Sequence, residues 1–515
     1  MTNWQTKPNL RRVMKMTIDL SVSELPSPVL EFGGAASGSD LKEGLLSAGP
    51  FDMRFGSARP DKISVGLVGP GELIDSAVAW LDRCEDGIGA LREGSKLRRS
   101  FDGFSSVFRK KIVTSDLMTI RIGTEGRDLI ADAIRSDEPL VRFTKVLGLY
   151  DDALKQLASR EINRPDIVLV CIPPDVRERA GNVTKELSDE AKAVAKSFAK
   201  RQKSRQLDLL DLLETVEEGP DDLIKRDLHN ALKAKALKYR LPIQIVTRKL
   251  LHETNESEDP ATRAWNFSVG LYYKSGGVPW RLRPEGPQTC FVGVTFHHVE
   301  RAKSHIVRSS LAHAFSSDGE GFAIRGGGVP VEPGQALNVH LSYEQAFDLG
   351  ERIISEYRLR TGAAPLRVVV HKTSDFDDDE REGFQQALAD IPIVSLITLT
   401  PSPLRLFRFG TYPPKVGTVF SVNDTRTFLY TTGLIPEVGT YPGPHIPQPV
   451  EIRGVTSENL EIAARDALNL TRMNWNTADL KGRHPITLSF ARRVGGILTE
   501  FGDEDPEETS FRYFV

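Results

Sequence analysis

The sequence has few cysteines and no long apolar run. Its three cysteines, Cys84, Cys171 and Cys290, lie far apart in 515 residues, so we expect buried free thiols and neither a disulfide framework nor a metal site. No apolar stretch reaches the roughly 18 residues that cross a bilayer, and the N-terminal residues lack the apolar core of a signal peptide. These absences predict a cytoplasmic protein that does not contact a membrane.

A large net charge of either sign is also missing. The formal net charge is −3, which argues against a surface covered with basic residues. Positive charge is nevertheless concentrated locally, because Lys225–Lys249 contains eight Lys or Arg and one acid, Asp227. A second basic cluster is interleaved with Phe101, Phe104 and Phe108 and consists of Lys96, Arg98, Arg99, Arg109, Lys110 and Lys111. Each cluster suits a phosphate backbone, and each is equally consistent with a solvated basic face.

Apolar runs alternate with segments of helical period, which is typical of doubly wound α/β layers. The expected strands are Ile63–Val68, Ile167–Ile172 and Ile243–Val246 and, from near Cys290 onward, Phe291–Phe296, Leu366–His371, Ile393–Leu399, Leu404–Arg408 and Thr418–Val422. The expected helices are Glu72–Cys84, 126–160, two charged helices within 183–235, Ser342–Leu359, Asp377–Ala389, Ser457–Leu468 and Ile486–Thr499. Residues 1–60 are expected to form short strands and loops.

Two motifs have both a functional and a structural interpretation. Gly66–Gly71 follows a strand and opens a helix, as in dinucleotide-binding folds, but its spacing is wrong and Pro70 interrupts it, which favours a structural turn. Asp375–Glu380 could hold a divalent metal, but its acids lie where a helix should start and complement the helix dipole, which favours capping. The acids between Asp503 and Glu508 are predicted to form an exposed loop.

Four polar residues form a candidate site for a terminal phosphate. His229 and Lys233 are spaced i,i+4 and therefore share one helix face. Gln244 lies on the strand that follows, and Lys274 precedes Gly276-Gly277, which suits the last turn of a helix and its glycine cap. Two ammonium groups and an amide that meet at one point would bind phosphate. The spacing alone does not establish that they meet.

The same residues carry a resemblance to a known family. His229, Lys233, Gln244 and Tyr273–Trp280 resemble the guide-binding motif in the MID domain of Argonaute proteins, and the continuation resembles their PIWI domain. The segments that carry the second resemblance are Phe291–Val294, Val368–Thr373, Thr431–Gly433, Leu470–Asn476, Pro485–Leu488 and Ala491, and Gly49–Asp52 near the start is similar to the family as well.

The resemblance implies a division of the chain. We expect a Rossmann-like MID domain over 61–285, with a charged helical insertion at about 180–225, and an RNase H-like PIWI domain over 286–515. Residues 1–60 would pack on this core. No PAZ domain would fit, an organisation similar to that of the short prokaryotic Argonautes.

The resemblance also implies roles for the site residues. Lys233, Gln244 and Lys274 would hold the 5′ phosphate of a guide, and His229 would contact its first nucleotide. The C-terminal carboxylate of Val515, together with Gln244, would hold Mg²⁺ at that phosphate, since a divalent ion relieves the repulsion between carboxylate and phosphate.

The PIWI catalytic positions depart from the family. Two-metal cleavage of nucleic acid needs clustered acidic ligands, but Thr295, Thr373 (or Lys372) and Arg492 stand at these positions. A threonine cannot replace the charge of a carboxylate and an arginine repels a metal, so we expect no cleavage activity. The chain would then be a catalytically inactive short Argonaute that uses guide RNA to recognise single-stranded target DNA.

An Argonaute without a nuclease needs an effector. The resemblance implies a heterodimer with an APAZ-domain protein that carries a TIR or sirtuin-type NADase or a nuclease, and the assembly could oligomerise on target binding. Its output would be NAD depletion or DNA degradation in defence against plasmids or phage. Two alternatives stay open: an active guide-dependent nuclease with displaced metal ligands in Asp375–Glu380, and a nucleotide-binding enzyme built on the Gly66–Gly71 turn.

Overall fold

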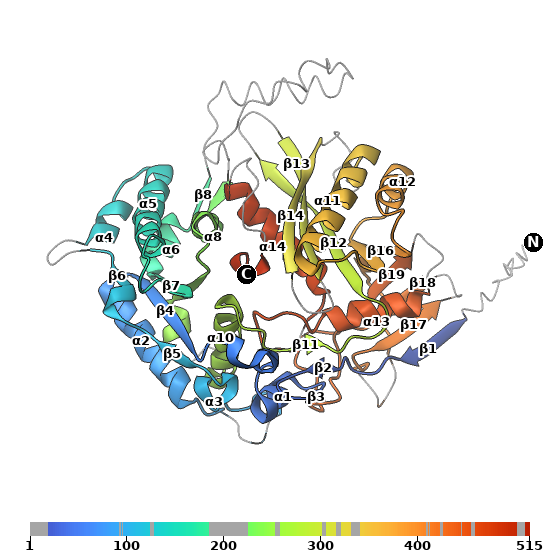
Figure 1. Cartoon of the computed structure of the whole chain (residues 1–515), viewed down its shortest axis with the longest axis horizontal. Coiled ribbons are helices and arrows are strands. Elements are labelled where there is room, and N and C mark those ends of the chain that lie inside the picture. The colour runs from blue at the N-terminus through green and yellow to red at the C-terminus, as the bar shows by residue number, and fades with distance from the viewer. Residues whose placement is uncertain are drawn as a thin grey trace, which may run out of the picture.

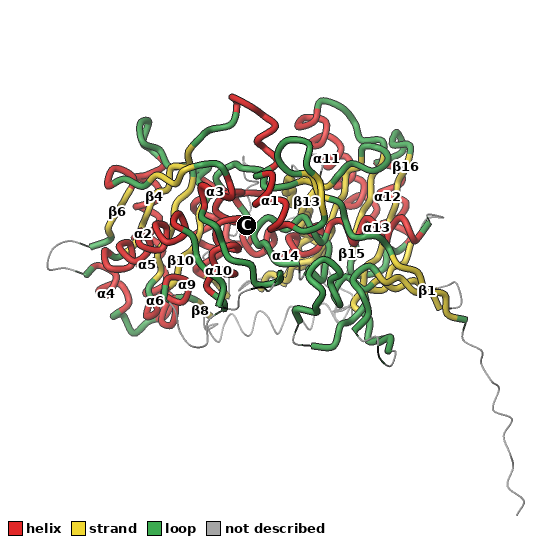
Figure 2. Tube along the Cα trace, turned by 90° about the horizontal axis from the view of Figure 1, so that it is seen from below, coloured by secondary structure: helices red, strands yellow, loops and turns green. Residues whose placement is uncertain are grey.

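The computed structural model of the chain describes residues 19–91, 94, 96–123, 128–184, 225–252, 258–300, 305–315, 321–330, 340–407, 410, 413–422, 426–443, 445–454, 459–480, 482–501 and 510–515. These residues form two α/β units that lie side by side, with the C-terminus between them (Figure 1). The same arrangement is visible from below in Figure 2. No helix in the described ranges is long and apolar enough to cross a membrane.

The first unit is built on a parallel sheet. Its strand order is β10–β7–β4–β5, with β6 also paired to β4. The strands are β4 (Lys62–Gly69), β5 (Lys111–Val113), β6 (Thr119–Arg121), β7 (Ile167–Ile172) and β10 (Ile243–Thr247). Every residue of β7 is buried, because helices cover both faces of a parallel sheet and leave no solvated side. The main helices are α2 (Gly71–Asp86), α5 (Pro139–Ala158), α8 (Leu228–Lys238) and α10 (Pro260–Lys274).

The second unit has a mixed sheet. Its nine described strands follow the order β1–β17–β18–β19–β16–β15–β12–β13–β14. Strand β12 pairs in parallel with β15 and antiparallel with β13, as the predicted RNase H-like sheet requires. The strands are β1 (Leu20–Glu24), β12 (Thr289–Glu300), β13 (His305–Phe315), β14 (Gly321–Pro330), β15 (Arg367–Lys372), β16 (Ile393–Pro401), β17 (Thr418–Val422), β18 (Arg426–Leu429) and β19 (Val450–Gly454).

Four helices belong to this second unit, and two of them begin with a capping box. They are α11 (Tyr343–Thr361), α12 (Asp378–Ala387), α13 (Leu460–Leu470) and α14 (Ile486–Phe501). Ser342 and Gln345 form a capping box at the start of α11, and Asp377 and Glu380 form one at the start of α12. The prediction that the Asp375–Glu380 run begins a helix is therefore confirmed.

The mixed α/β fold predicted from the sequence is confirmed, with local corrections. The expected 126–160 helix is two helices, α4 (Leu129–Ile134) and α5, because Pro139 favours the first turn of a new helix. Leu404–Phe407 is not a strand, although its pattern alternates. Residues 1–60 contain a helix, α1 (Leu41–Ala48), as well as β1, β2 (Leu30–Glu31) and β3 (Ser37–Gly38). Most of the charged insertion at about 180–225, and the acids between Asp503 and Glu508, lie outside the described residues.

A shared apolar core fixes the two units to each other. Trp280 and Trp475 are buried at 0% and 2% exposure, and the Trp475 indole donates to the main-chain oxygen of Trp280 at 3.0 Å. Helix α14 packs against β12 and β13 of its own sheet and against α8 of the first unit. The N-terminal strand β1 pairs with β17, so the start of the chain extends the second sheet. Groups from both units can therefore meet in a fixed geometry.

Candidate functional site

A cavity of about 770 Å³ lies where the two units meet. Its walls come from α8, β10 and α10 of the first unit and from α14 and the C-terminal residues of the second. The four residues predicted to form a phosphate site, His229, Lys233, Gln244 and Lys274, all line it. The structure thus brings together the residues whose convergence the sequence could not establish.

Helix α8 carries His229 and Lys233. The carboxylate of Asp227 caps the helix by accepting from the main-chain N–H of Asn230 at 2.9 Å, so α8 starts just before the two site residues. Lys233 is only 5% exposed, and its ammonium donates to the main-chain oxygen of Phe514 at 3.3 Å. A contact across 281 residues of sequence therefore ties the α8 lysine to the end of the chain.

Lys274 is the last residue of α10, as predicted. Gly276, two residues later, has φ of 94°, a conformation that favours glycine and lets the chain turn sharply after the helix. The turn leaves Lys274 3% exposed, and its ammonium donates to the side-chain oxygen of Gln244. Lys274 and Gln244 therefore form one polar wall of the cavity.

The electrostatics of the cavity favour an anion. Lys233, Lys274 and Arg493 all reach it, and no acid pairs with any of them among the residues that the structure describes. Burial first, and then the Arg493 guanidinium, lower the pKa of Lys274 to about 7. Burial, Lys274 and Arg493 together hold the pKa of Lys233 well below its usual range. Lys233 and Lys274 are buried and Arg493 is exposed; a buried cation without a paired carboxylate is costly, so this arrangement predicts a bound anion.

His229 lies at the mouth of the cavity. Desolvation first, and then the Lys233 ammonium, lower the pKa of its ring to about 4. The imidazole is therefore neutral at physiological pH. A neutral ring can stack on a nucleobase without adding to the repulsion among the cations.

Arg493 was not among the predicted site residues. The family resemblance points to Arg492, which follows Ala491, but the residue that lines the cavity is its neighbour Arg493. Only the position of α14 against α8 identifies it. Asn476 also lines the cavity. It belongs to the Leu470–Asn476 segment that carries the family resemblance, so the sequence could have predicted it as a site residue.

Val515 and Gln244, the predicted magnesium ligands, both line the cavity. Val515 is 2% exposed. Carboxylate and amide oxygens suit Mg²⁺, which usually needs further oxygens from phosphate or water. The Gln244 oxygen already accepts from Lys274, so these residues fit the ion only when a bound phosphate supplies additional ligands.

The positions that the family resemblance assigns to the catalytic acids lie on β12, just after β15 and on α14. Thr295 is buried on β12, next to Val294, which is paired with Lys372 of β15, and Thr373 follows Lys372 directly. Arg492 lies on α14, which packs against β12. The pairing of β12 with β15 therefore places the two threonines near each other, and neither offers a carboxylate.

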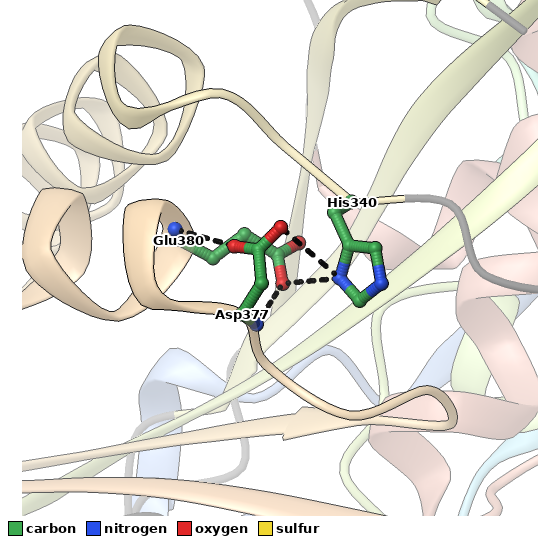
Figure 3. A group of neighbouring side chains, drawn as sticks. All are labelled: His340, Asp377 and Glu380. Atoms are coloured by element: carbon green, nitrogen blue, oxygen red, sulfur yellow. Dashed lines mark hydrogen bonds and ion pairs between the residues drawn. The ribbon is translucent and has the colours of Figure 1, made fainter. Parts of the chain in front are cut away.

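A buried charge network lies beside these positions. The Lys372 ammonium donates to the carboxylate of Glu380 at 2.5 Å, and both side chains are at most 1% exposed. Figure 3 shows that His340 and Asp377 approach the same carboxylate, and the three side chains have the spacing of metal ligands. The ammonium already neutralises Glu380. In the rest of the acidic run, Asp375 pairs with Arg453 at 3.0 Å and Asp378 with Arg381 at 2.9 Å.

The other two motifs have structural explanations. A Cβ at Gly69 would lie 2.6 Å from the main-chain oxygen of Cys171, so glycine is needed for β4 to pack beside β7. In the second basic cluster, Phe101, Phe104 and Phe108 are at most 1% exposed and belong to the core. They cannot stack on bases, and Arg99 of the same cluster pairs with Glu43.

Comparison with known proteins shows a similarity in fold. No family model matches the chain, and no curated protein does. The solved structure of Clostridium butyricum Argonaute bound to a guide DNA and a 19-mer target DNA matches 95% of this chain and 54% of its own, at 14% identity and a TM-score of 0.59. A. aeolicus Argonaute matches 96% of this chain and 55% of its own, at 16% identity and a TM-score of 0.52.

A further structure of the A. aeolicus protein, Aa-Ago with externally bound siRNA, has a TM-score of 0.51 at 14% identity and matches 96% of this chain. The chain spans about half the length of these structures, 54–56%. The fold of the chain is therefore Argonaute-like.

Proposed function

We propose that the cavity between the two units binds the 5′ phosphate of a nucleic-acid guide. The observation that carries this proposal is the convergence of Lys233, Lys274 and Arg493, without an acidic partner in the described part of the chain, on one cavity. A terminal phosphate brings up to two negative charges and several acceptor oxygens to one point, which matches this set of donors. The Argonaute-like fold gives the site a context, since one similar structure is bound to a guide and a target.

The guide is proposed to be RNA and the target single-stranded DNA. Base pairing would read the target sequence while the protein holds the backbone. His229 would contact the first nucleotide of the guide at the mouth of the cavity. Magnesium is proposed to join the site with the phosphate, held by the Val515 carboxylate and Gln244, where it would reduce the repulsion between the two anions.

The protein is proposed to lack cleavage activity. Thr295 and Thr373 offer no carboxylate for two-metal catalysis. The alternative, a nuclease with displaced ligands, would need the Asp375–Glu380 acids, but Asp375, Asp378 and Glu380 already pair with cations and Asp377 caps α12. This use of the acids supports the inactive form.

Activity is proposed to reside in a partner. An APAZ-domain effector with a TIR or sirtuin-type NADase or a nuclease would form a heterodimer with this chain and respond to target recognition, in defence against plasmids or phage. This part of the proposal rests on the family resemblance alone.

A binding experiment tests the site. The purified protein is titrated with one short RNA carrying either a 5′ phosphate or a 5′ hydroxyl, and the ratio of the two affinities is called the phosphate preference below. We expect a clear preference for the phosphorylated RNA, and equal affinities would refute the proposal. Incubation with guide, matched target DNA and Mn²⁺ tests activity, since cleavage that is lost on changing Asp375–Glu380 would favour the nuclease alternative.

A further inference from the structure

A second contact between the units involves a buried ion pair. Arg226 and Glu500 are each 7% exposed, and both the Nε and Nη2 atoms of Arg226 lie 3.0 Å from one oxygen of Glu500. The other oxygen of Glu500 accepts from the main-chain N–H of Asp227 at 3.1 Å. Asp227 is the residue that caps α8, so Glu500 holds the chain where this helix begins.

The same face of α14 reaches both the ion pair and the cavity. Arg493 and Glu500 are seven residues apart, which is two helical turns, and therefore share one face of α14. Gly496 lies between them, and a Cβ there would meet the side-chain nitrogen of Asn230 on α8 at 2.9 Å. The glycine allows the two helices to approach closely, and the ion pair fixes how α14 sits along α8.

We infer that Arg226 and Glu500 are a positioning pair that sets the distance between Arg493 on α14 and Lys233 on α8, and so determines how well the cavity matches a phosphate. The inference rests on the proposed function of the cavity. Neither residue of the pair touches the phosphate; both act through the placement of α14. A phosphate site depends on donor placement within a fraction of an ångström, so a small shift of α14 lowers affinity without unfolding either unit.

A buried ion pair can position α14 because its hydrogen bonds are directional. An arginine and a carboxylate with two bound donors accept few alternative geometries. The Arg226 guanidinium also lies 4.7 Å from the centre of the Phe143 ring of α5, which fixes its plane. An apolar contact at this place would hold the helices together but would let them slide.

The test uses the isosteric variant Glu500→Gln and measures the phosphate preference. We expect the preference to fall by about tenfold, the effect of losing one well-placed charge-assisted hydrogen bond. The matched control is Asp466→Asn, which disrupts another largely buried ion pair, Arg367–Asp466 at 2.7 Å, whose residues do not line this cavity. This control should keep the wild-type preference.

A double-mutant cycle separates positioning from general destabilisation. In an Arg493→Ala background, Glu500→Gln should lower the preference by less than about threefold, because its effect passes through Arg493. An unchanged preference in Glu500→Gln, or an equal loss in both backgrounds, would overturn the inference. If Glu500→Gln does not fold, Glu500→Asp serves in its place with the same expected direction, and a wild-type preference there overturns the inference as well. A wild-type protein without any phosphate preference would instead refute the proposed function.

Discussion

Lys274→Met should lower phosphate binding while leaving the fold as stable as before, or more so. Burial and the Arg493 charge lower the pKa of Lys274 to about 7, which corresponds to a cost on the order of 5 kcal/mol for keeping the ammonium charged in the empty cavity. Methionine is similar in volume and carries no charge, so it removes this cost. The loss of the lysine ammonium leaves the Gln244 oxygen without its hydrogen-bond donor, which costs about 1–3 kcal/mol. The free energy of unfolding should therefore rise by roughly 2–4 kcal/mol at pH 7.

Binding should change in the opposite direction. A hydrogen bond from a charged group contributes about 1.5–3 kcal/mol, so Lys274→Met should weaken the affinity for the 5′-phosphorylated RNA by about 10- to 150-fold. The affinity for the 5′-hydroxyl RNA should change much less. Fluorescence titrations at fixed ionic strength measure both affinities, and denaturant unfolding measures stability.

The control is Lys62→Met, which removes an exposed lysine at the start of β4. It reports the effect of one lost surface charge on nucleic-acid binding, and it should leave the phosphate preference unchanged. A parallel fall in stability and binding for Lys274→Met would show that the lysine is structural and would refute the reasoning.

Four further outcomes follow from the structure. Because the pKa of Lys274 is lowered, its buried charge destabilises the fold fully below pH 7, and this destabilisation diminishes as the pH rises. The melting temperature of the ligand-free protein should therefore rise between pH 7 and 9. The rise should be smaller in Lys274→Met. The phosphate preference should fall over the same interval by up to about tenfold per pH unit, and a constant preference would show that phosphate binding does not depend on the protonated lysine. Removing divalent ions with EDTA should lower the preference by less than Lys274→Met does, and no change would count against the magnesium proposal. Lys372→Met should lower the free energy of unfolding by about 3–5 kcal/mol, since Glu380 keeps a buried charge without its ammonium; denaturant unfolding would contradict this if the loss were below about 1 kcal/mol.

The helices and strands that the sequence predicted well are those whose bounds depend on their own residues and immediate neighbours. Strand β7 is apolar throughout and matches the predicted Ile167–Ile172, and α10 ends at Lys274 because Gly276 follows. The hairpin of β13 and β14 was missed, since its second strand contains three consecutive glycines, Gly326 to Gly328, that weaken any strand pattern. Leu404–Phe407 shows the opposite case, in which an alternating pattern has no neighbouring strand to pair with in the described structure.

The candidate site was predictable only in part, because it belongs to neither unit alone. His229, Lys233, Gln244 and Lys274 could be proposed from motif spacing, since they lie within 46 residues of one unit. Arg493 could not, because nothing in its local sequence shows that α14 crosses to α8. Contacts between distant segments depend on how whole helices pack, and one sequence contains no direct record of that packing.

The contrast among the buried lysines is the strongest argument that the cavity is functional. Lys110 faces Asp52 at 3.7 Å, and Lys372 donates to Glu380, so each of these buried ammonium groups has a carboxylate beside it. Lys233 and Lys274 contact only neutral oxygens in the described structure, and Arg493 adds a third positive charge to the same space. A buried charge without a partner destabilises a fold, and the chain neutralises Lys110 and Lys372 with carboxylates. Selection for stability alone would remove such a cluster, and for this reason we propose that the cavity binds an anionic ligand.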